Sequence, residues 1–329
     1  MRILVTGGTG FTGAALVWRL LKDGHSVSVL DKQPGLAAEQ LSEGGAEIAY
    51  GSVTDREAVA KSIAGAEVVM HVAAAFRETG APDSLYKSVN VEGTRIVVEE
   101  AKRVGARKLV YCSTQGIHGN IDNPPGDENS PVRPEDYYQQ TKFEGEQMVR
   151  ATAAPDLEYT ILRPTAIYGP GDPERFVMIY RRVVKGHFPM FGSGKTFYHP
   201  VYIDNLVDAF VLAMDSGVGA GEAYIIGDEE YLSIEELVRK VARAIDVDVS
   251  VPHLPIGPLI VAGHICERLC KPFGINPPIF PRRVDWFRQV RAFSIDKAKR
   301  ELGYQPRVGL DEGLRKTGEW YREFGYLPK

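Results

Sequence analysis

Residues 2–13 have the sequence RILVTGGTGFTG, a short aliphatic run followed by four glycines. We predict a strand before the glycines and a helix after them, so the glycines form the turn between the two. Their spacing fits G-x-G-x-x-G at Gly8, Gly10 and Gly13, and equally G-x-x-G-x-x-G from Gly7. Glycines permit a tight turn and close backbone approach to a pyrophosphate, and the helix N-terminus offers free N–H groups. The stretch therefore predicts a dinucleotide-binding turn.

Asp31 stands at the end of the next predicted strand, residues 26–31. A carboxylate at this place in a dinucleotide-binding fold can bind the adenosine ribose hydroxyls and repel a 2′-phosphate. Asp31 therefore favours NAD as the cofactor. Lys32 follows directly and weakens this preference, so NADP stays open.

The first half of the chain alternates short apolar runs with helical stretches, which is typical of βαβ units and a mostly parallel sheet. The runs are nearly continuously apolar, as expected of strands covered on both faces. The expected strands are 2–6, 26–31, 46–50, 68–72, 108–113 and 159–163, and the expected helices are 13–22, 35–42, 55–64, 91–104 and 134–153. This pattern predicts an α/β fold with a Rossmann-type doubly wound parallel sheet and a smaller C-terminal part that binds the substrate.

The second half changes character after the Gly/Pro-rich loop at 168–173. Further strands are expected at 198–203 and 223–226, and helices at 175–185, 205–215, 234–245, 260–271, 296–302 and 310–324. We predict a cofactor-binding domain over 1–168, to which 196–228 returns, and a substrate-binding part over 169–195 and 229–329. Residues 251–281 are rich in proline and aliphatic side chains and are expected to be irregular. The stretch 251–280 could line a hydrophobic pocket or be simple core and loop, and both interpretations stay open.

Composition excludes several classes of protein. The chain of 329 residues has 39 Lys and Arg against 43 Asp and Glu, so it lacks the basic excess of a nucleic-acid-binding protein. Three cysteines cannot form a disulfide framework, and Cys266 and Cys270 lack the C-x-x-C spacing of a zinc site, so no metal is expected. No signal peptide or membrane-spanning stretch is found. We therefore expect a cytoplasmic protein that acts on a small molecule.

Tyr138 and Lys142 stand four residues apart on a predicted helix, which places both side chains on one face. A nearby ammonium favours the tyrosinate and prepares the tyrosine for proton transfer. Ser113 and Thr114 follow a predicted strand at the carboxyl edge of the sheet, where ligands bind in open α/β folds. A hydroxyl there could hold a substrate oxygen beside Tyr138.

Further segments extend the pattern along nearly the whole chain. They are GSVTD at 51–55, HVAAA at 71–75, VNVEGT at 89–94, YCSTQGIHG at 111–119, YQQTK at 138–142, LRPTAIYGPGD at 162–172, YIDN at 202–205 and KAKRELGYQP at 297–306. With the glycine turn and Asp31, they resemble the extended short-chain dehydrogenases/reductases, that is, the NAD-dependent epimerase/dehydratase superfamily.

The resemblance implies a role for each matching residue. Tyr138 would be the general acid/base, Lys142 would bind the nicotinamide ribose and tune Tyr138, and Thr114 would be the catalytic hydroxyl. The remaining cofactor contacts implied are Gly7, Gly10, Phe11 and Thr12 at the pyrophosphate, Ala73 and Ala74 beneath the cofactor, and Pro164 at the nicotinamide. Ser52, followed by Val53, stands where the family often has an aspartate that contacts adenine, and His118 where it often has tyrosine. The resemblance also implies a homodimer formed through the helices at 91–104 and 134–153.

Two departures bear on the substrate. Nucleotide-sugar members of the family typically have an asparagine where this chain has Ala166, and Arg-Asp where it has Tyr198 and His199. Neither alanine nor tyrosine supplies the contacts that a diphosphate needs. The segment 202–213 is more similar to the 3β-hydroxysteroid/sterol dehydrogenase-like branch, which includes reductases of 2-alkyl-3-oxo acids.

We therefore predict an NAD(P)-dependent oxidoreductase that transfers hydride at a secondary alcohol or ketone of a hydrophobic substrate, sterol-like or a 3-oxo acid. The alternatives are a nucleotide-sugar 4-epimerase or dehydratase, and a non-catalytic protein that senses NAD(H). The presence of Tyr138, Lys142 and Thr114 argues against the sensor.

Overall fold

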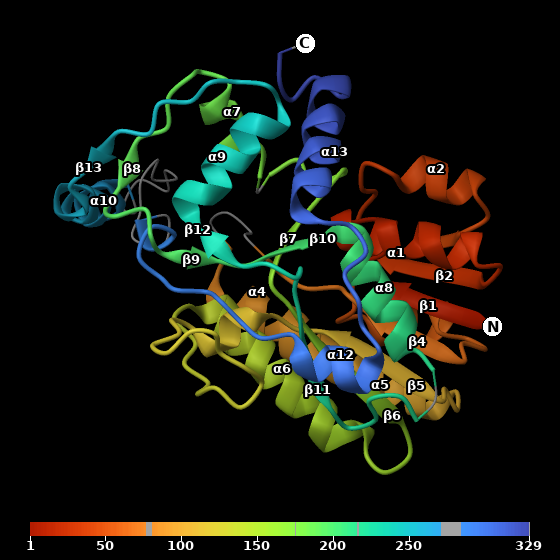
Figure 1. The fold of residues 1–329 in the computed structure, drawn as a ribbon. Coiled ribbons are helices and arrows are strands. Elements are labelled where there is room, and N and C mark those ends of the chain that lie inside the picture. Colours follow the sequence, from red (N-terminus) through yellow and green to blue (C-terminus); the bar gives the residue numbers. More distant parts are fainter. Residues whose placement is uncertain (77–80, 175, 216, 271–283, 329) are drawn as a thin grey trace.

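The computed structural model describes residues 1–76, 81–174, 176–215, 217–270 and 284–328, and its centre is a seven-stranded sheet (Figure 1). The strands are β1 (Arg2–Thr6), β2 (Ser26–Asp31), β3 (Glu47–Tyr50), β4 (Val68–His71), β5 (Lys108–Cys112), β6 (Glu158–Pro164) and β11 (Ala223–Ile226). Their order is β11-β6-β5-β4-β1-β2-β3, and every neighbouring pair is parallel. The predicted α/β fold with a doubly wound parallel sheet is confirmed.

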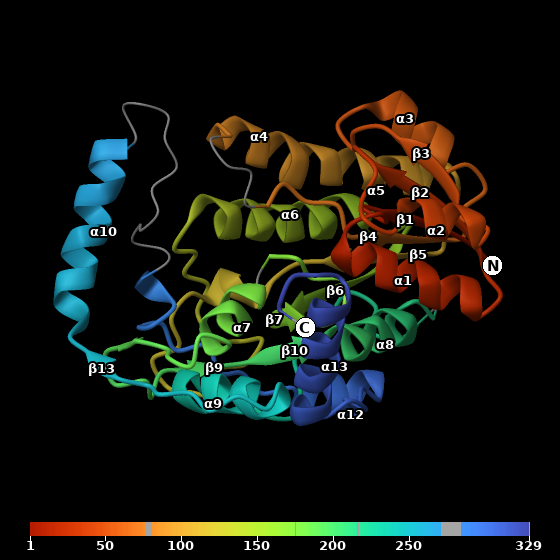
Figure 2. The same ribbon diagram turned by 90° about the horizontal axis from the view of Figure 1, so that it is seen from above.

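Helices cover both faces of this sheet (Figure 2). One face carries α1 (Phe11–Lys22) and α8 (Ile203–Ala213), with α2 (Ala38–Glu43) beside α1; the other carries α3 (Arg56–Ser62), α5 (Thr94–Arg103) and α6 (Tyr137–Ala153). Alternate residues of each strand point to opposite faces. Ile3 and Val5 of β1 accordingly join one hydrophobic cluster with α1 and α8, whereas Leu4 joins a second cluster with α3, α5 and α6.

The smaller part is built from helices and very short strands. Its helices are α7 (Val177–Val183), α9 (Ile234–Ala244), α10 (Ile256–Cys270) and α13 (Leu310–Glu323). The short strand pairs outside the large sheet, among the described residues, are β10 (Pro200–Tyr202) with β7 (Ala166–Tyr168), β12 (Leu232–Ser233) with β9 (Phe197–Tyr198), and β13 (His253–Leu254) with β8 (Met190–Phe191). Helix α9 packs against α7 and α13, while α10 stands apart at the far end of this part (Figure 2).

The chain passes between the two parts more than once. β11 pairs with β6, which places residues 223–226 in the large sheet. Helix α12 (Asp296–Leu302) packs against β11 and α8. The cluster that includes α1 and α8 also contains residues of α9 and α13, so one hydrophobic core spans both parts. The proposed domain limits remain a prediction.

Some elements differ from their expected limits. The helix expected at 91–104 starts as a π-helical segment, η1 (Ser88–Gly93), which continues into α5; the short helix α4 (Asp83–Lys87) before it was not predicted. The helix expected from 260 is present as α10 but begins earlier, at Ile256, so the irregular stretch expected from 251 is shorter than predicted in its described part. Arg175 and Lys271, where two expected helices begin and end, lie outside the described residues. Within the described ranges, no helix has both the length and the apolar composition needed to cross a membrane.

Candidate active site

The glycine turn joins β1 to α1 and requires glycine at two of its positions. Gly7 has a φ of +70°, and a Cβ on it would lie 2.8 Å from the backbone of Ala73. A Cβ on Gly13 would lie 2.0 Å from the carbonyl oxygen of Gly7. Helix α1 begins after Gly10 with no side-chain cap on its first N–H groups, which belong to Phe11 and Thr12. Uncapped N–H groups behind a loop of bare backbone suit a pyrophosphate, so these residues fit a dinucleotide.

Asp31 lies beside the glycine turn at the end of β2. Its Oδ2 accepts hydrogen bonds from the backbone N–H of Thr9 at 2.9 Å and from the Thr9 hydroxyl at 2.8 Å. Its Oδ1 accepts one from the N–H of the exposed Lys32 at 2.8 Å. The carboxylate therefore fixes the turn, and Oδ1 keeps acceptor capacity for a ribose hydroxyl.

The other predicted cofactor contacts follow neighbouring strands at the same carboxyl edge. Ala73 and Ala74 follow β4, where the Ala73 N–H donates to the Thr6 hydroxyl at 3.3 Å. Ser52 and Val53 follow β3; the Ser52 hydroxyl pairs with that of Thr54 at 2.7 Å, and Val53 is buried. Pro164 is the last residue of β6 and is buried. The structure thus brings all of these segments to one edge of the sheet.

Helix α6 positions the predicted catalytic pair. Its N-cap, Asp136, accepts a hydrogen bond from the N–H of Gln139 at 2.8 Å, which fixes the helix start beside Tyr138. Lys142 is buried one turn later, and its Nζ lies 4.3 Å from the ring centroid of Tyr111 on β5. Burial lowers the pKa of Lys142 to about 8, opposed by the nearby Cys112 and by Glu146. The pKa of the amine therefore lies near the range in which proton transfer is efficient at neutral pH.

Tyr138 and Thr114 lie on adjoining elements. The ring of Tyr138 is half-buried and packs against that of Phe76, with centroids 4.8 Å apart. Thr114 follows β5 and caps the 3₁₀ helix η2 (Gln115–His118), because its hydroxyl accepts from the N–H of Gly116 at 3.0 Å. Gly116 lies against the start of α6: a Cβ there would be 3.2 Å both from Thr114 Oγ1 and from the Gln139 side chain. The two predicted groups thus share the region where η2 meets α6.

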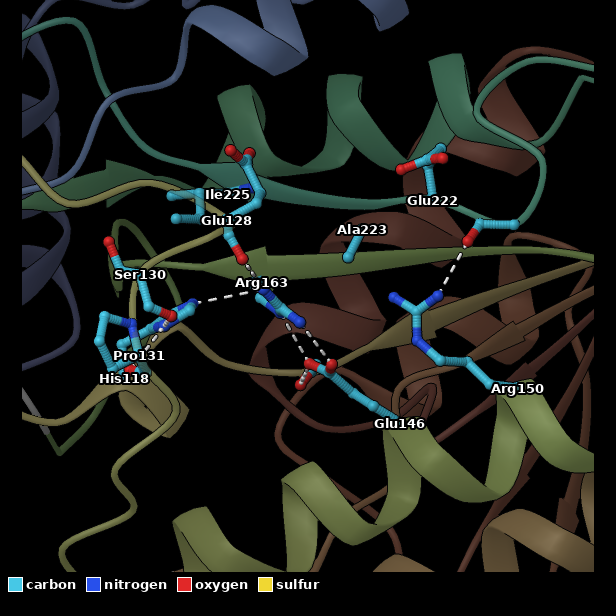
Figure 3. Close-up of polar contacts among 12 residues, drawn as sticks. His118, Glu128, Ser130, Pro131, Glu146, Arg150, Arg163, Glu222, Ala223 and Ile225 are labelled. Atoms are coloured by element: carbon cyan, nitrogen blue, oxygen red, sulfur yellow. Dashed lines mark hydrogen bonds and ion pairs between the residues drawn. The ribbon is translucent and has the colours of Figure 1, made fainter.

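Ser113 does not offer the second free hydroxyl that the sequence suggested. It is buried and donates to Oε1 of Glu146 at 2.5 Å. Glu146 is paired with Arg163 of β6 through two further hydrogen bonds, of 2.9 and 2.7 Å (Figure 3). Ser113 therefore belongs to a buried polar network, and Thr114 is the hydroxyl left for the site.

The network continues to His118. Arg163 Nη1 donates to Nε2 of His118 at 3.3 Å and to the backbone oxygen of Glu128 at 3.2 Å (Figure 3). Because a carbonyl only accepts, His118 must donate from Nδ1 to the oxygen of Ser130 at 2.9 Å. Nε2 accepts from Arg163, so the imidazole is neutral, and burial and the charge of Arg163 lower the pKa of His118 accordingly. His118, which replaces a tyrosine common in the resembling family, therefore positions the loop that follows η2.

Two buried polar residues at the site were not assigned a role from the sequence. Asn90 of η1 binds both backbone groups of Ala75 and donates to the hydroxyl of Thr141 at 3.0 Å, which ties the chain after β4 to α6. Glu146 follows Lys142 by four residues on α6, so the helical spacing that revealed the pair also indicated Glu146. Asn90 had no such indication, because its partners come from distant segments.

Tyr198 and His199 lie in an apolar, aromatic environment. Tyr198 is buried among Phe176, at a ring-centroid distance of 6.3 Å, and Trp286, at 6.0 Å. His199 donates from Nε2 to the backbone oxygen of Asp228 at 2.8 Å, and burial lowers its pKa to about 4. Neither position therefore supplies a positive charge at neutral pH. Among the described residues, no group of three or more His, Cys, Asp or Glu side chains is arranged to hold a metal ion.

Comparison with known proteins agrees with this geometry. A model of the NAD dependent epimerase/dehydratase family matches residues 3–227. The 3 beta-hydroxysteroid dehydrogenase/Delta 5→4-isomerase of Mycobacterium tuberculosis is 33% identical over 97% of this chain and 90% of its own length. The 2-alkyl-3-oxoalkanoate reductase of Stenotrophomonas maltophilia is 32% identical over 96% of this chain and 98% of its own. The structure of Thermotoga maritima UDP-glucose 4-epimerase with UDP-glucose superimposes with a TM-score of 0.80 and 27% identity over 98% of this chain and 99% of that one. The chain therefore belongs to the NAD dependent epimerase/dehydratase family and is an NAD-dependent enzyme.

Proposed function

We propose that this enzyme transfers hydride reversibly between NAD(H) and a secondary alcohol or ketone on a hydrophobic substrate. The observation that carries the substrate class is the environment of Tyr198 and His199. Where the resemblance places the Arg-Asp of nucleotide-sugar enzymes, this chain has a buried aromatic side chain and a neutral imidazole. A diphosphate needs cationic, bidentate donors, and these two positions provide none.

The residues on α6 and at the start of η2 have separate roles in the proposed reaction. In the oxidative direction, Tyr138 Oη takes the hydroxyl proton of the substrate, and in reduction it returns that proton. Lys142 keeps a positive charge close to Tyr138, which stabilises the tyrosinate. Thr114 holds the substrate oxygen beside Tyr138. Bound NAD supplies the hydride acceptor at its nicotinamide ring, and NADH the donor.

The cofactor would be held by the groups gathered at the carboxyl edge of the sheet. The N–H groups of Phe11 and Thr12 would bind the pyrophosphate, and Gly7 and Gly10 would let it approach the backbone. The free acceptor capacity of Asp31 Oδ1 favours the 2′-hydroxyl of NAD over the 2′-phosphate of NADP. The rest of the cofactor would lie along residues that follow or end neighbouring strands, namely Ser52, Val53, Ala73, Ala74 and Pro164.

Two further observations support a hydrophobic substrate. The ring of Phe76 packs against that of Tyr138, so an apolar surface lies next to the proposed acid/base. Relatives that cover nearly the whole chain are a hydroxysteroid dehydrogenase and a reductase of 2-alkyl-3-oxoalkanoates. A sterol-like alcohol or a 3-oxo acid is therefore the substrate class we favour.

The structural similarity to a UDP-glucose 4-epimerase supports a second candidate function. A nucleotide-sugar epimerase would use the same Tyr138 but would retain its NAD through a transient keto-sugar. Ala166, buried in β7, is the residue that weighs against it, because the nucleotide-sugar pattern has asparagine there. A protein that only senses NAD(H) would not need the polar groups collected around α6.

We also infer a homodimer in which α5 and α6 pair with their counterparts. The two helices pack against each other on one face of the sheet, with the short helix α4 beside the start of α6 (Figure 2). The molar mass measured by light scattering after size-exclusion chromatography tests this inference. A monomeric mass at micromolar concentration would contradict it.

A substrate screen with a tyrosine variant tests the proposed function. Purified enzyme with NAD(H) is offered alicyclic and long-chain hydroxy or keto compounds and, separately, UDP- and dTDP-sugars, while NADH absorbance is followed. We expect turnover only with the hydrophobic set, reduced by about 10²–10⁴-fold in Tyr138→Phe, the usual contribution of a general acid/base. Tyr137→Phe is the matched control, because Tyr137 is exposed on the same helix turn. Sugar-nucleotide turnover without net NADH change would establish the epimerase instead.

A further inference from the structure

His71 ends strand β4, two residues before Ala73, which we place beneath the cofactor. We call residues 73–75 the cofactor segment. The His71 side chain is fully buried, and each nitrogen of its ring faces a threonine hydroxyl. Nδ1 lies 2.7 Å from Thr6 Oγ1 on β1, and Nε2 lies 3.0 Å from Thr94 Oγ1 at the start of α5. The proposed reaction gives this imidazole no role, yet its two contacts lead in different directions through the protein.

The outer partners of the two threonines determine the direction of these hydrogen bonds. The Thr94 hydroxyl donates to the backbone oxygen of Asn90 at 2.8 Å, so it can only accept from Nε2–H of His71. Burial lowers the pKa of His71 to about 3, so the ring is neutral and Nδ1 is an acceptor. The Thr6 hydroxyl therefore donates to Nδ1, while its oxygen accepts from the N–H of Ala73 at 3.3 Å. Nδ1 thus holds the cofactor segment, and Nε2 leads to Asn90.

The hydrogen bonds continue from Asn90 into helix α6. Asn90 Nδ2 donates to the hydroxyl of Thr141 at 3.0 Å, and that hydroxyl donates to the backbone oxygen of Tyr138, also at 3.0 Å. Helix α6 packs closely on Asn90 at a second point, because a Cβ on Gly145 would lie 2.7 Å from the backbone oxygen of Asn90. A continuous series of hydrogen bonds therefore runs from the backbone of Ala73 to the backbone of Tyr138.

This series resists any shift between its two ends. Its side chains from Thr6 to Thr141 are all buried, and a buried donor or acceptor that loses its partner destabilises the fold. The series joins β1, β4, η1, α5 and α6, so a movement of α6 away from β4 would leave several of these groups unpaired. Such placement matters for catalysis, because a displacement of about 1 Å can reduce a rate about 10²-fold. The series therefore limits how far Tyr138 can move from the cofactor segment.

We propose that His71 is a positioning residue that holds the start of α6, and with it Tyr138, at a fixed distance from the cofactor segment. The importance of Tyr138 rests on the proposed function, whereas the link between α6 and the cofactor segment stands without it. Asn90 provides a second link, since it also binds the backbone of Ala75. Loss of one hydrogen bond of His71 should therefore loosen the arrangement without unfolding the protein.

Two substitutions of His71 each keep one of its hydrogen bonds. The amide in His71→Asn reaches the place of Nδ1 and accepts from Thr6, and the amide in His71→Gln reaches the place of Nε2 and donates to Thr94. For His71→Asn we expect kcat to fall about tenfold and backbone amides at the start of α6 to exchange hydrogen faster without cofactor, at an unchanged Kd for NADH. For His71→Gln we expect the Kd for NADH to rise about tenfold, with amide exchange in α6 and kcat at saturating NADH unchanged.

A second pair of variants leaves His71 in place. Thr94→Val removes the hydroxyl at nearly constant volume and should behave like His71→Asn, whereas Thr94→Ser keeps the hydroxyl and should behave like wild type. Equal changes in both His71 variants, no change in either, or equal losses in both Thr94 variants would overturn the proposal, because His71 would then only fill space. NADH affinity, followed by fluorescence, and hydrogen exchange need no substrate. A wild type that turns over no hydrophobic substrate would therefore count against the proposed function and not against this link.

Discussion

At the scale of single residues, the proposed site contains a lysine that is kept out of water. Lys142 lies beneath the ring of Tyr111, and burial lowers its pKa from 10.5 to about 8. In the unfolded chain the amine keeps its proton up to 10.5. The unfolded state therefore binds more protons between these two values, and the stability of the fold rises with pH across that window. Burying this amine therefore costs stability, as expected for a residue with the chemical role we propose for it.

Lys142→Met should separate these two effects. Near neutral pH we expect catalytic turnover to fall by about 10²–10⁴-fold, in line with the loss of a group that supports acid/base catalysis. We expect the free energy of unfolding to rise by up to about 3 kcal/mol, because the burial penalty of the ammonium disappears. Urea unfolding followed from neutral pH to 10.5 measures the second effect, and the advantage of the variant should shrink as wild type deprotonates.

A variant that is both inactive and less stable would contradict this account. Lys102→Met is the control, since Lys102 lies on the same face of the sheet but is partly exposed in a salt bridge with Asp156. Its replacement should leave the turnover unchanged.

At the scale of elements, α6 presents Tyr138, Lys142 and Glu146 on one face at intervals of four residues. Glu146 anchors this face to β6 through Arg163 and to the end of β5 through Ser113 (Figure 3). The helix is therefore held against two strands by a buried charged pair. Removing one member of such a pair leaves the other buried without its counter-charge.

We expect Glu146→Gln to lower the free energy of unfolding by roughly 3–5 kcal/mol, the usual cost of breaking a buried ion pair. The double variant Glu146→Leu/Arg163→Met should lose less than the two single variants together, because no charge is left unpaired. Asp122→Asn provides the matched exposed pair, since Asp122 binds Arg133 at the surface and should cost at most about 1 kcal/mol. Equal losses for Glu146→Gln and Asp122→Asn in urea unfolding would show that the buried pair has no such role.

The same helix shows how far the sequence predicts a site. The i, i+4 spacing predicted that Tyr138 and Lys142 share a face of α6, and the structure places both there. It could not predict that Ser113 would be committed to Glu146, because a hydrogen bond between residues 33 positions apart depends on how the strands are ordered. Asn90 was not predicted for the same reason, since its partners are Ala75, which follows β4, and Thr141 on α6.

Element limits follow a similar rule. β1, β2, β11 and α12 have the limits expected from the sequence, because apolar runs and helix-forming segments encode them locally. The sequence did not predict the two-residue strands β8, β9, β12 and β13. Two residues are too few to show a periodicity, and the strand that each pairs with is distant in the sequence. The π-helical segment η1 before α5 and the early start of α10 at Ile256 likewise have no local pattern that distinguishes them.

At the scale of the whole molecule, one side chain links the two parts of the chain. Asn205 of α8 is buried and uses all four of its hydrogen-bonding positions. Its Nδ2 donates to Asp228 Oδ1 at 2.8 Å and to the backbone oxygen of Val308 at 2.9 Å. Its Oδ1 accepts from the N–H groups of Arg307 and Val308 at 2.9 and 3.0 Å. The segment that leads into α13 is thereby fastened to α8 and to the chain after β11.

This link joins parts that already share one hydrophobic cluster, so the two parts should not unfold independently. Asp228 makes the link sensitive to pH. Burial raises the pKa of Asp228 to about 6, opposed by the hydrogen bonds from Tyr202 and Asn205. Between 3.8, its ordinary value, and 6 the folded state binds more protons than the unfolded state, so the contribution of Asp228 to stability falls as the pH rises through that window.

Asn205→Asp should enlarge this effect, because it removes the donor to Asp228 and sets a second carboxylate beside the first. Two carboxylates at hydrogen-bond distance cannot both ionise cheaply, so the pair keeps a proton in the folded state to a higher pH than Asp228 alone. The variant should therefore be only modestly destabilised near pH 4 and lose progressively more stability above pH 6. Asn205→Leu is the uncharged control. It leaves Asp228 and the Val308 oxygen without their donor and the N–H groups of Arg307 and Val308 without their acceptor, at about 1–3 kcal/mol for each unsatisfied group, so it should be destabilised at every pH without a second carboxylate. Urea unfolding of both variants at several pH values tests whether the two carboxylates interact. Parallel pH profiles would mean that they do not, and that Asn205 fastens the C-terminal segment by its hydrogen bonds alone.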